Sequence, residues 1–375
     1  MSAGGTAVRA GRTRRGPREV VVGAMSVFSA FGAGVEPLLA AVSAGTPGFA
    51  PVERFDVGTR RAKVAAAAPG SPDLVRELVR AVDEVCDFER DGTRLFLALH
   101  GDPALARSPE TARTDAFAQR IAAECGLAGA RAYTSACVAA STAVADAAAL
   151  IAHGRADRVV VAAGYLVEPD QYALFDAGRA LAADGQVRPF STGRGGLLLG
   201  DAVGAVVLEA AGTSGSEPLA RLAGWGRAGD AYHVCKPRPD GLGLARAITD
   251  ALDRAGLRPT DIGYVNAHGS GTKQSDAAET AALYAALGDA ADKIPVSSTK
   301  SIHGQALEAG ALLELIVTIA ALRAGRLPVN AGFLGADDDC RLDLVLEPAA
   351  AALTHALTLN VAFGGANTAL LVGAP

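Results

Sequence analysis

Hydrophobic and polar positions along the chain follow two alternating patterns. Short continuous apolar runs, typical of buried strands, are separated by longer segments in which apolar residues recur with helical spacing. The clearest run is "RVVVAA" at Arg158–Ala163, directly after a helical pattern over Ser141–His153. Continuous apolar strands alternating with helices predict buried, mostly parallel sheets with helices on both faces.

This alternation runs twice along the chain. Strands are predicted at Val20–Val22, Leu95–Leu99, Arg158–Ala163, Gly204–Glu209, Leu219–Trp225, Ile262–Asn266, Pro295–Ser298, Leu342–Leu346, Ala356–Val361 and Thr368–Val372. Further helices are predicted at Leu74–Val85, Leu244–Ala255 and Leu307–Ala324. A Gly- and Ser-rich stretch, Gly212–Glu217, is the best linker candidate. We therefore expect two similar α/β halves, over residues 20–211 and 218–375.

Composition limits the classes of protein that this chain can be. Half of its 375 residues are hydrophobic and a fifth are charged, so it can bury a sizeable core. The formal net charge of −5 argues against a general nucleic-acid-binding protein. The chain has no run of about 18 uncharged apolar residues, so no transmembrane helix is predicted. Residues 1–19 carry five arginines, lack the apolar run of a signal peptide, and are predicted to be a disordered basic segment.

The cysteines indicate a protein without disulfides and with one reactive thiol. Five are spread along the chain without a CxxC pair, which favours a cytoplasmic protein and gives no metal-ligand spacing. Cys137 stands out because small residues surround it in "YTSACVAASTAVAD" and a helical pattern follows at once. At a strand-to-helix turn, the helix dipole would lower the pKa of Cys137. Backbone N–H groups there could bind a thioester oxyanion. Because a lone cysteine is more often structural, the surrounding sequence must decide between a structural and a catalytic role for Cys137.

That context resembles the β-ketoacyl synthases. Five blocks match the family in order after the "TACSSG"-like cysteine segment: "LFDAGRALAADGQVRPFSTGRGGLLLGDAVGAVVLE", "GDAYHVCKPRPDGLGLARAI", "VNAHGSGTKQSDAAE", "STKSIHGQALEAGALLELI" and "NVAFGGANTALLV". The fourth resembles the family pattern "STKSmxGHxlgAaGaxExi". The resemblance spans roughly Val20 to Val372 and implies a thiolase-like fold, with two similar α/β halves in α-β-α-β-α layers. Thiolase itself is disfavoured, because the "AFGGAN" loop lacks that family's second cysteine. A dinucleotide-binding interpretation through a GxGxxG motif finds no support, and no cofactor is implied.

The resemblance implies a reaction and the residues that perform it. In the family a cysteine takes an acyl chain from an acyl carrier protein, and two histidines then assist decarboxylation of a malonyl thioester. Cys137 matches the cysteine, and His268 in "NAHGSGT" matches the first histidine. The second should follow Gly304 in the "KSxxGH" element, where this chain has Gln305. The register holds because Glu314 falls on the family's downstream glutamate.

Gln305 is the main departure from the family pattern. An amide donates two hydrogen bonds but cannot carry a proton near neutral pH. The initiating synthases, a related branch, use a Cys-His-Asn set, so an amide could serve as a donor to the enolate. If the missing histidine acts as a base, condensation should fall by about 10²–10⁴. His303, two residues earlier, is expected to be a structural or supporting residue.

The resemblance also implies supporting residues around this set, namely Lys300, Glu314, Asp276 and Glu279. A glycine-rich loop that lines or gates the acyl pocket would consist of Phe363, Gly364 and Gly365. Two segments, Ala65–Asp91 and Gly101–Arg131, are shorter than usual. In the family these segments help to form the dimer interface and to roof the acyl tunnel.

Three functional hypotheses follow. The leading one is a condensing acyltransferase of fatty acid or type II polyketide assembly, with acyl carrier protein thioesters as substrates. The second is a non-catalytic partner subunit that resembles a chain-length factor, although such subunits typically lack the cysteine. The third is acyl transfer from Cys137 to an amine or alcohol without condensation. The resemblance implies a homodimer or a heterodimer with another ketosynthase.

Overall fold

A computed structural model describes residues 16–100 and 114–375 of the chain. Most of the predicted basic segment 1–19, and part of the shortened segment Gly101–Arg131, therefore lie outside the described residues. Residues 16–19 lead directly into the first strand. There Arg18 forms an ion pair with Asp157 at 2.6 Å.

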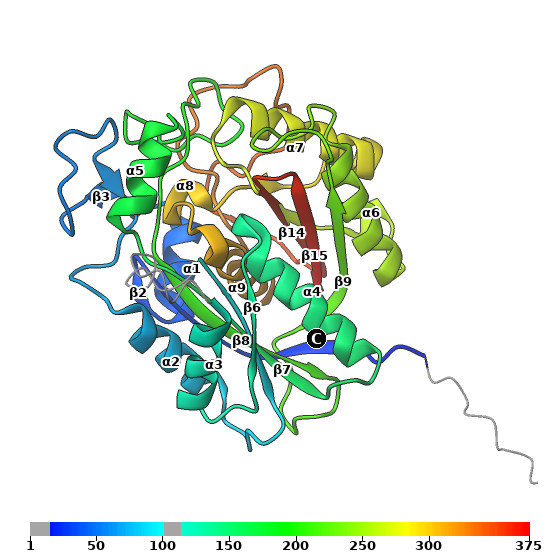
Figure 1. The fold of residues 1–375 in the computed structure, drawn as a ribbon. Helices are drawn as coiled ribbons and strands as arrows, with labels where there is room; N and C mark the ends of the chain where they lie inside the picture. The colour runs from blue at the N-terminus through cyan, green and yellow to red at the C-terminus, as the bar shows by residue number, and fades with distance from the viewer. Residues whose placement is uncertain (1–15, 101–113) are drawn as a thin grey trace, which may run out of the picture.

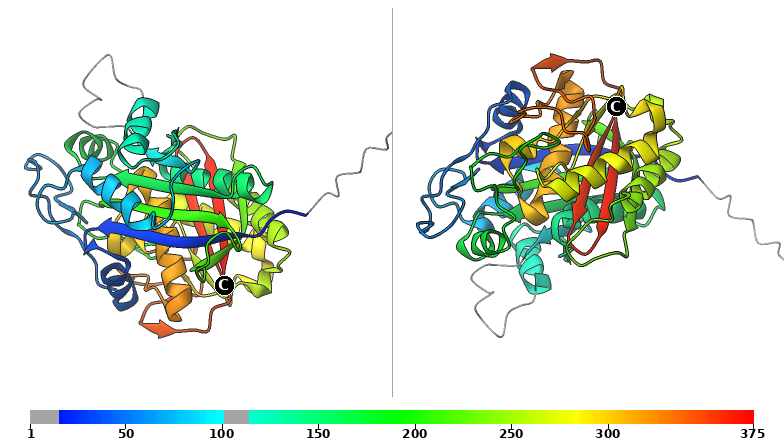
Figure 2. Two further views of the ribbon diagram at one scale, coloured as in Figure 1. Left: turned by 90° about the horizontal axis from the view of Figure 1, so that it is seen from below. Right: turned by 90° about the horizontal axis from the view of Figure 1, so that it is seen from above.

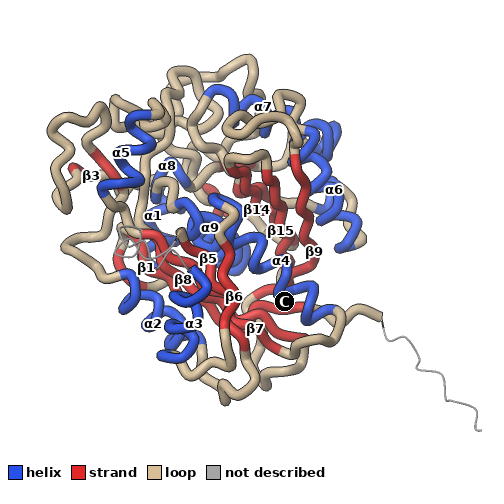
Figure 3. Tube along the Cα trace, in the orientation of Figure 1, coloured by secondary structure: helices blue, strands red, loops and turns tan. Residues whose placement is uncertain are grey.

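The main sheet has 11 strands within the described ranges (Figures 1 and 3). Its principal strands are β1 (Val20–Ser29), β5 (Arg94–Leu99), β6 (Ala130–Tyr133), β7 (Arg158–Tyr165), β8 (Ala202–Ala210), β9 (Ala220–Gly229), β10 (Tyr264–Asn266), β11 (Val296–Ser297), β14 (His355–Ala362) and β15 (Ala366–Gly373). The short strand β2 (Gly32–Ala33) pairs with the end of β1. Two small sheets pair β3 (Ala50–Pro51) with β4 (Val64–Ala65), and β12 (Arg326–Leu327) with β13 (Ala349–Ala350).

The strand order reveals two halves of the same topology. In the first half β1, β8 and β7 are antiparallel neighbours, and β5 and β6 continue from β7 in parallel. In the second half β9, β15 and β14 are antiparallel, and β10 and β11 continue in parallel. Within the main sheet, the halves join where β1 pairs with β9, at Val21–Arg221 and Val22–Ala220. The predicted pair of similar α/β halves is thus confirmed.

The prediction of mostly parallel sheets is wrong, because each half mixes both directions. The cause of the error is physical. The antiparallel strands β7 and β8 are buried on both faces, so they carry the continuous apolar runs that usually mark parallel strands.

Helices form three layers around the two halves (Figures 1 and 2). The long helices α4 (Ala139–Ala152) and α9 (Leu307–Ala324) pack on each other between the halves. Helices α2 (Leu74–Val85) and α3 (Thr114–Glu124) cover the first half, and α6 (Leu242–Ala255) packs on the second half beside α7 (Lys273–Leu287). The remaining helices are α1 (Val35–Ala44), α5 (Pro169–Ala177), α8 (Lys300–His303), η1 (Ala136–Val138), η2 (Pro259–Asp261) and η3 (Gly288–Ala290). This is the predicted α-β-α-β-α arrangement.

The composition of the central helices explains their position. α9 is buried from Leu307 to Leu322, which suits a helix that is apolar around its whole circumference. α4 consists largely of alanine, whose small side chain allows close approach to the strands on both sides. The predicted bounds of α2 and α9 match the structure. The predicted strand Leu342–Leu346 is wrong, because this segment forms only an isolated bridge between Leu344 and Val296.

Close packing of α6 on β9 gives a test of the fold. A Cβ atom at Gly226 would lie 1.8 Å from the carbonyl oxygen of Ala247, whereas nothing lies within 4 Å of a Cβ atom at Gly229 on the same strand. We expect Gly226→Ala to lower the free energy of unfolding by about 1–3 kcal/mol, because helix and strand must separate. Gly229→Ala is the matched control, and chemical denaturation is the measurement. Equal effects of the two substitutions would contradict this packing.

Candidate active site

Cys137 lies in the short helix η1, between β6 and the central helix α4. The residue before it, Ala136, has a φ of 48°, in the left-handed region that alanine seldom adopts. Backbone strain of this kind is concentrated at functional sites. The sharp turn brings the thiol to the wall of a pocket of about 420 Å³. The predicted strand-to-helix placement of Cys137 is therefore what the structure has.

Burial, however, dominates the electrostatics of the thiol. It raises the pKa of Cys137 to about 12, and the negative charges of Glu308 and Glu314 act in the same direction, against Lys300. The helix dipole was expected to lower this pKa. That expectation left out the cost of removing a thiolate from water. It also left out the negative charge of Glu308, a residue far from Cys137 in the sequence.

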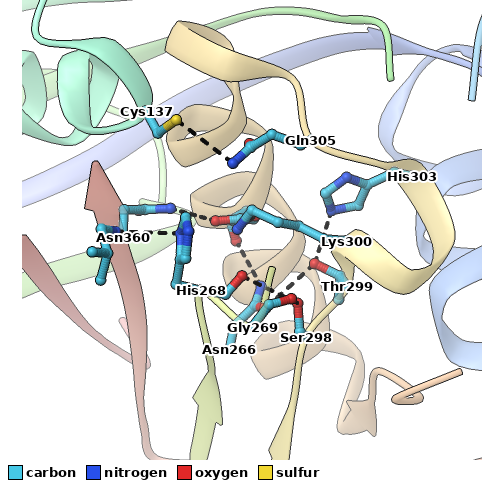
Figure 4. Close-up of polar contacts among 12 residues, drawn as sticks. Cys137, Asn266, His268, Gly269, Ser298, Thr299, Lys300, His303, Gln305 and Asn360 are labelled. Atoms are coloured by element: carbon cyan, nitrogen blue, oxygen red, sulfur yellow. Dashed lines mark hydrogen bonds and ion pairs between the residues drawn. The ribbon is translucent and has the colours of Figure 1, made fainter. Parts of the chain in front are cut away.

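His268 lies on the loop after β10 and lines the same pocket as Cys137. The backbone N–H of Val361 donates to its Nδ1 at 3.3 Å (Figure 4). Burial and the nearby Lys300 charge hold the pKa of His268 well below its usual value, so the ring is neutral at pH 7. With Nδ1 accepting, the ring proton lies on Nε2. His268 is thus prepared as a hydrogen-bond donor.

Gln305 lies between α8 and α9 and contacts Cys137 directly. Its Nε2 donates to the Sγ of Cys137 at 3.6 Å, as Figure 4 shows. Its backbone is tied to the strand-like segment before β8, because its N–H donates to Leu198 O at 2.7 Å and its carbonyl accepts from Gly200 N at 3.0 Å. Cys137, His268 and Gln305 therefore line one pocket, although they come from both halves of the chain.

A buried ion pair supports the segments that carry His268 and Gln305. Lys300 on α8 pairs with Glu314 on α9, and both side chains are almost fully buried. The other oxygen of Glu314 accepts from Asn360 Nδ2 at 2.5 Å, which ties the pair to β14. Asn266 at the end of β10 donates to Glu314 O at 3.3 Å. The pair thus links the elements that carry His268 and Gln305.

Two buried carboxyl groups on α7 hold the His268 loop. Glu279 accepts from the backbone N–H groups of His268 and Gly269, both at 2.7 Å. Asp276 accepts from Phe190 N at 2.9 Å and from Gly271 N at 3.2 Å. Burial raises the pKa of Glu279 to about 8 and that of Asp276 to about 7.

His303 makes its contacts away from Cys137 (Figure 4). Its Nε2 lies 2.9 Å from Thr299 Oγ1, and its Nδ1 lies 2.8 Å from Gly304 O. Burial lowers the pKa of His303 to about 3, so the ring is neutral. Both ring nitrogens are occupied within the α8 turn, and the ring has no contact with the thiol.

The turn between β14 and β15 forms the mouth of the pocket. Phe363 is 54% exposed and stacks on Phe175 of α5, with ring centroids 6.2 Å apart. Gly364 and Gly365 follow with φ values of 88° and 75°, which shape the turn. Phe175 and Phe363 both line the pocket that contains Cys137.

Several residues of the site were not found from the sequence. Phe175 and Asn360 have no local signal, because only the fold brings them to the pocket and to Glu314. Glu308 did have a signal, since it is a charged residue in the otherwise apolar run "ALEAGALL". Within residues 16–100 and 114–375, no group of His, Cys, Asp or Glu is arranged to hold a metal ion. No helix in those ranges combines the length and hydrophobicity needed to cross a bilayer.

The raised pKa of Cys137 predicts how fast the thiol is alkylated at different pH. Only the thiolate reacts, so the rate should rise by about tenfold per pH unit from pH 7 to 10 without reaching a plateau. Peptide mapping after reaction with iodoacetamide distinguishes Cys137 from the exposed Cys235. A plateau below pH 8 would show that the helix dipole outweighs burial.

Comparison with known proteins places this geometry in a family. The family model "Beta-ketoacyl synthase, N-terminal domain" matches residues 93–213, and "Beta-ketoacyl synthase, C-terminal domain" matches residues 219–334. The loop between β8 and β9 lies where the two models meet. Among solved structures, "The ishigamide ketosynthase/chain length factor" has a TM-score of 0.87 at 27% identity and covers 96% of this chain and 100% of its own. A β-ketoacyl synthase from Burkholderia phymatum STM815 has a TM-score of 0.84 at 25% identity, with the same coverage.

Curated relatives agree with these matches. "Putative polyketide beta-ketoacyl synthase 1" from Streptomyces cyaneus is 36% identical over 286 residues, which cover 73% of this chain and 67% of the relative. 3-Oxoacyl-[acyl-carrier-protein] synthase 2 from Staphylococcus aureus is 34% identical over 251 residues, or 64% of this chain and 62% of the relative. Nodulation protein E from Rhizobium meliloti is 39% identical over 244 residues, or 63% and 60%. The matched part thus spans about two thirds of each relative. On this fold and these matches, the chain belongs to the β-ketoacyl synthase family.

Proposed function

We propose that this chain is a condensing acyltransferase of fatty acid or polyketide biosynthesis. Cys137 takes an acyl group from an acyl carrier protein thioester, and a malonyl thioester then extends it. The observation that carries the proposal is the convergence of three groups on one pocket: the Cys137 thiol, the Nε2–H of neutral His268, and the Gln305 amide that donates to Cys137. The retained Cys137 thiol, at the turn before its own helix, counts against a subunit that only shapes a tunnel.

Loading requires no net change in protonation. The sulfur of Cys137 attacks the carrier thioester, a new thioester forms on Cys137, and the carrier thiol leaves with the proton that Cys137 loses. The oxyanion of the tetrahedral intermediate forms at the start of α4, where backbone N–H groups and the helix dipole favour negative charge.

Extension is the step in which Gln305 replaces a histidine. Loss of carbon dioxide from the malonyl thioester breaks a C–C bond and leaves the electron pair on an enolate. No proton is transferred in this step, so donors to the enolate oxygen are sufficient. His268 Nε2–H and Gln305 Nε2–H both supply such donors. The enolate carbon then attacks the acyl-cysteine carbonyl, the C–S bond breaks, and the Cys137 thiolate that leaves takes up one proton from water.

Partners and compartment follow from this chemistry as part of the proposal. The substrates are thioesters on an acyl carrier protein, and the chain pairs either with itself or with another ketosynthase subunit. Similarity to a ketosynthase/chain length factor structure favours the second pairing. Cys137 must remain reduced, and we therefore assign the protein to the cytoplasm. No cofactor, nucleic acid or membrane enters the proposed reaction.

A second candidate function is a non-catalytic partner subunit that resembles a chain-length factor. The same structural similarity supports it, as does the loss of the second histidine. The third, acyl transfer without condensation, is favoured by the Cys137–Gln305 contact, since an amide leaves loading intact. The three candidates differ in what accumulates on Cys137.

Intact-protein mass spectrometry separates these functions. The chain is mixed with acyl carrier protein thioesters, then with malonyl carrier protein, and compared with Cys137→Ala. We expect an acyl adduct that the substitution abolishes, and a ketoacyl product. An adduct without product would leave transfer alone, and no adduct would identify the partner subunit.

Substitution of Gln305 tests its role in extension. Gln305→Leu should retain loading on Cys137 but reduce ketoacyl formation by about 10²–10³, because one donor to the enolate is lost. Gln305→His should restore extension. Gln186→Leu, at an exposed glutamine outside the pocket, is the matched control. Unchanged product formation in Gln305→Leu would remove Gln305 from the mechanism.

A further inference from the structure

A glycine in the first turn of α9 lies against the amide of Gln305. Gly310 is buried within this helix. A Cβ atom there would lie 2.9 Å from Gln305 Oε1. Apart from the neighbours of Gly310 in the chain and the backbone of its own helix, no other atom of the described residues lies within 4 Å of that Cβ position. The space that Gly310 leaves free is therefore the space beside the amide oxygen.

The helix itself gives no reason for a glycine at this position. Glycine loses more conformational freedom on folding than alanine does, so it destabilises a helix that alanine would stabilise. The φ of Gly310 is not in the left-handed region, in contrast to that of Gly325 at the end of the same helix. The contact with Gln305 does give a reason, because only glycine leaves Oε1 in its place.

The backbone around the contact is fixed on both sides. The N–H of Gln305 donates to Leu198 O at 2.7 Å, and its carbonyl accepts from Gly200 N at 3.0 Å. The α9 helix is buried from Leu307 to Leu322. A methyl group at position 310 would therefore displace the end of the Gln305 side chain, whose last torsion is soft. Because the amide is planar, Oε1 cannot move without Nε2.

The same contact explains which way the amide points. The first turn of a helix presents backbone N–H groups and the positive end of the helix dipole, which favour an oxygen over an NH₂ group. Gln305 Oε1 lies at this turn, beside Gly310. Nε2 is then left to donate to the Sγ of Cys137, at 3.6 Å. The amide thus offers the thiol a donor rather than an acceptor.

Two departures from the family pattern come together at this contact. In the pattern "GHxlgAaGa" the position of Gln305 holds histidine and that of Gly310 holds alanine, which a glycine follows. In this chain Gly310 comes first and Ala311 follows. An amide at position 305 is thus accompanied by the loss of the one methyl group that would collide with it.

We propose that Gly310 is a positioning residue for Gln305, because it leaves room for the amide oxygen against α9 and so directs the amide Nε2–H to Cys137. This placement is independent of the reaction that the protein performs. Its consequence for extension rests on the proposed function, in which the same N–H group donates to the enolate.

The rate of alkylation of Cys137 tests the placement of the amide. A hydrogen bond from Nε2 stabilises the thiolate, so we expect Gly310→Ala in the full-length protein to slow the reaction with iodoacetamide at pH 9 by about tenfold. The midpoint of thermal denaturation should be unchanged or higher, because alanine favours the helix. Gly215→Ala, in a loop where a Cβ atom meets nothing within 4 Å, is the matched control. An unchanged alkylation rate in Gly310→Ala overturns the proposal.

A double-mutant cycle separates positioning from a general disturbance of the core. Gly310→Ala is repeated in the Gln305→Leu variant, which has no amide oxygen. We expect no further slowing of Cys137 alkylation there, because the group that the methyl displaces is absent. Equal slowing in both backgrounds overturns the proposal. Should Gly310→Ala lower the thermal midpoint, the cycle still decides: a loss that persists in Gln305→Leu overturns the proposal, and a loss that disappears supports it.

Ketoacyl formation distinguishes this inference from the proposed function. Gly310→Ala should reduce extension by at least about tenfold, because the donor to the enolate is displaced. The double variant Gln305→His/Gly310→Ala, which has the histidine and alanine of the family pattern, should extend at least as fast as Gln305→His, and a slower rate contradicts the proposal. If wild type forms no product while alkylation responds as expected, the proposed function fails and the role of Gly310 stands. If wild type is active and alkylation is unchanged, only the role of Gly310 fails.

Discussion

The buried ion pair between Lys300 and Glu314 is the interaction on which the site depends. Removing two charges from water costs several kcal/mol for each ion, so the pair must be held in place by its surroundings. Asn360 on β14 and Asn266 on β10 provide that support. Burial, together with the nearby charge of Lys300, lowers the pKa of His268 and keeps its ring neutral. If the pair were broken, the unpaired charge would disturb β14, α8 and α9 together, and with them the positions of His268 and Gln305.

The fold was predicted from the apolar pattern, whereas the three pocket residues were predicted from motif resemblance. The two halves follow from repeated apolar runs, because burial on both faces imposes such runs whatever the strand direction. For the same reason the direction of β7 and β8 could not be read from their sequence. Cys137, His268 and Gln305 came from motif resemblance, and the structure places all three around one pocket. Their roles remain proposals.

Other features of the site could not be predicted because they depend on long-range contacts. The pairing of Glu308 with His100 joins residues more than 200 positions apart. The pKa of Cys137 depends on enclosure by segments from both halves, which the cysteine segment cannot reveal. Phe175 and Phe363 meet only because α5 lies beside the β14–β15 turn. Local patterns predict elements, whereas solvation and pairing are properties of the assembled molecule.

The repeated topology places Cys137 and Gln305 at equivalent positions of the two halves. η1 and α4 follow β6, and α8 and α9 follow β11, which are equivalent strands of the two halves. Cys137 and Gln305 thus precede equivalent central helices and meet across the approximate twofold relation between the halves. A single structural position, present twice, supplies the nucleophile in one copy and the hydrogen-bond donor in the other. Internal duplication has freed each copy to specialise, which a symmetric pair of identical halves could not do.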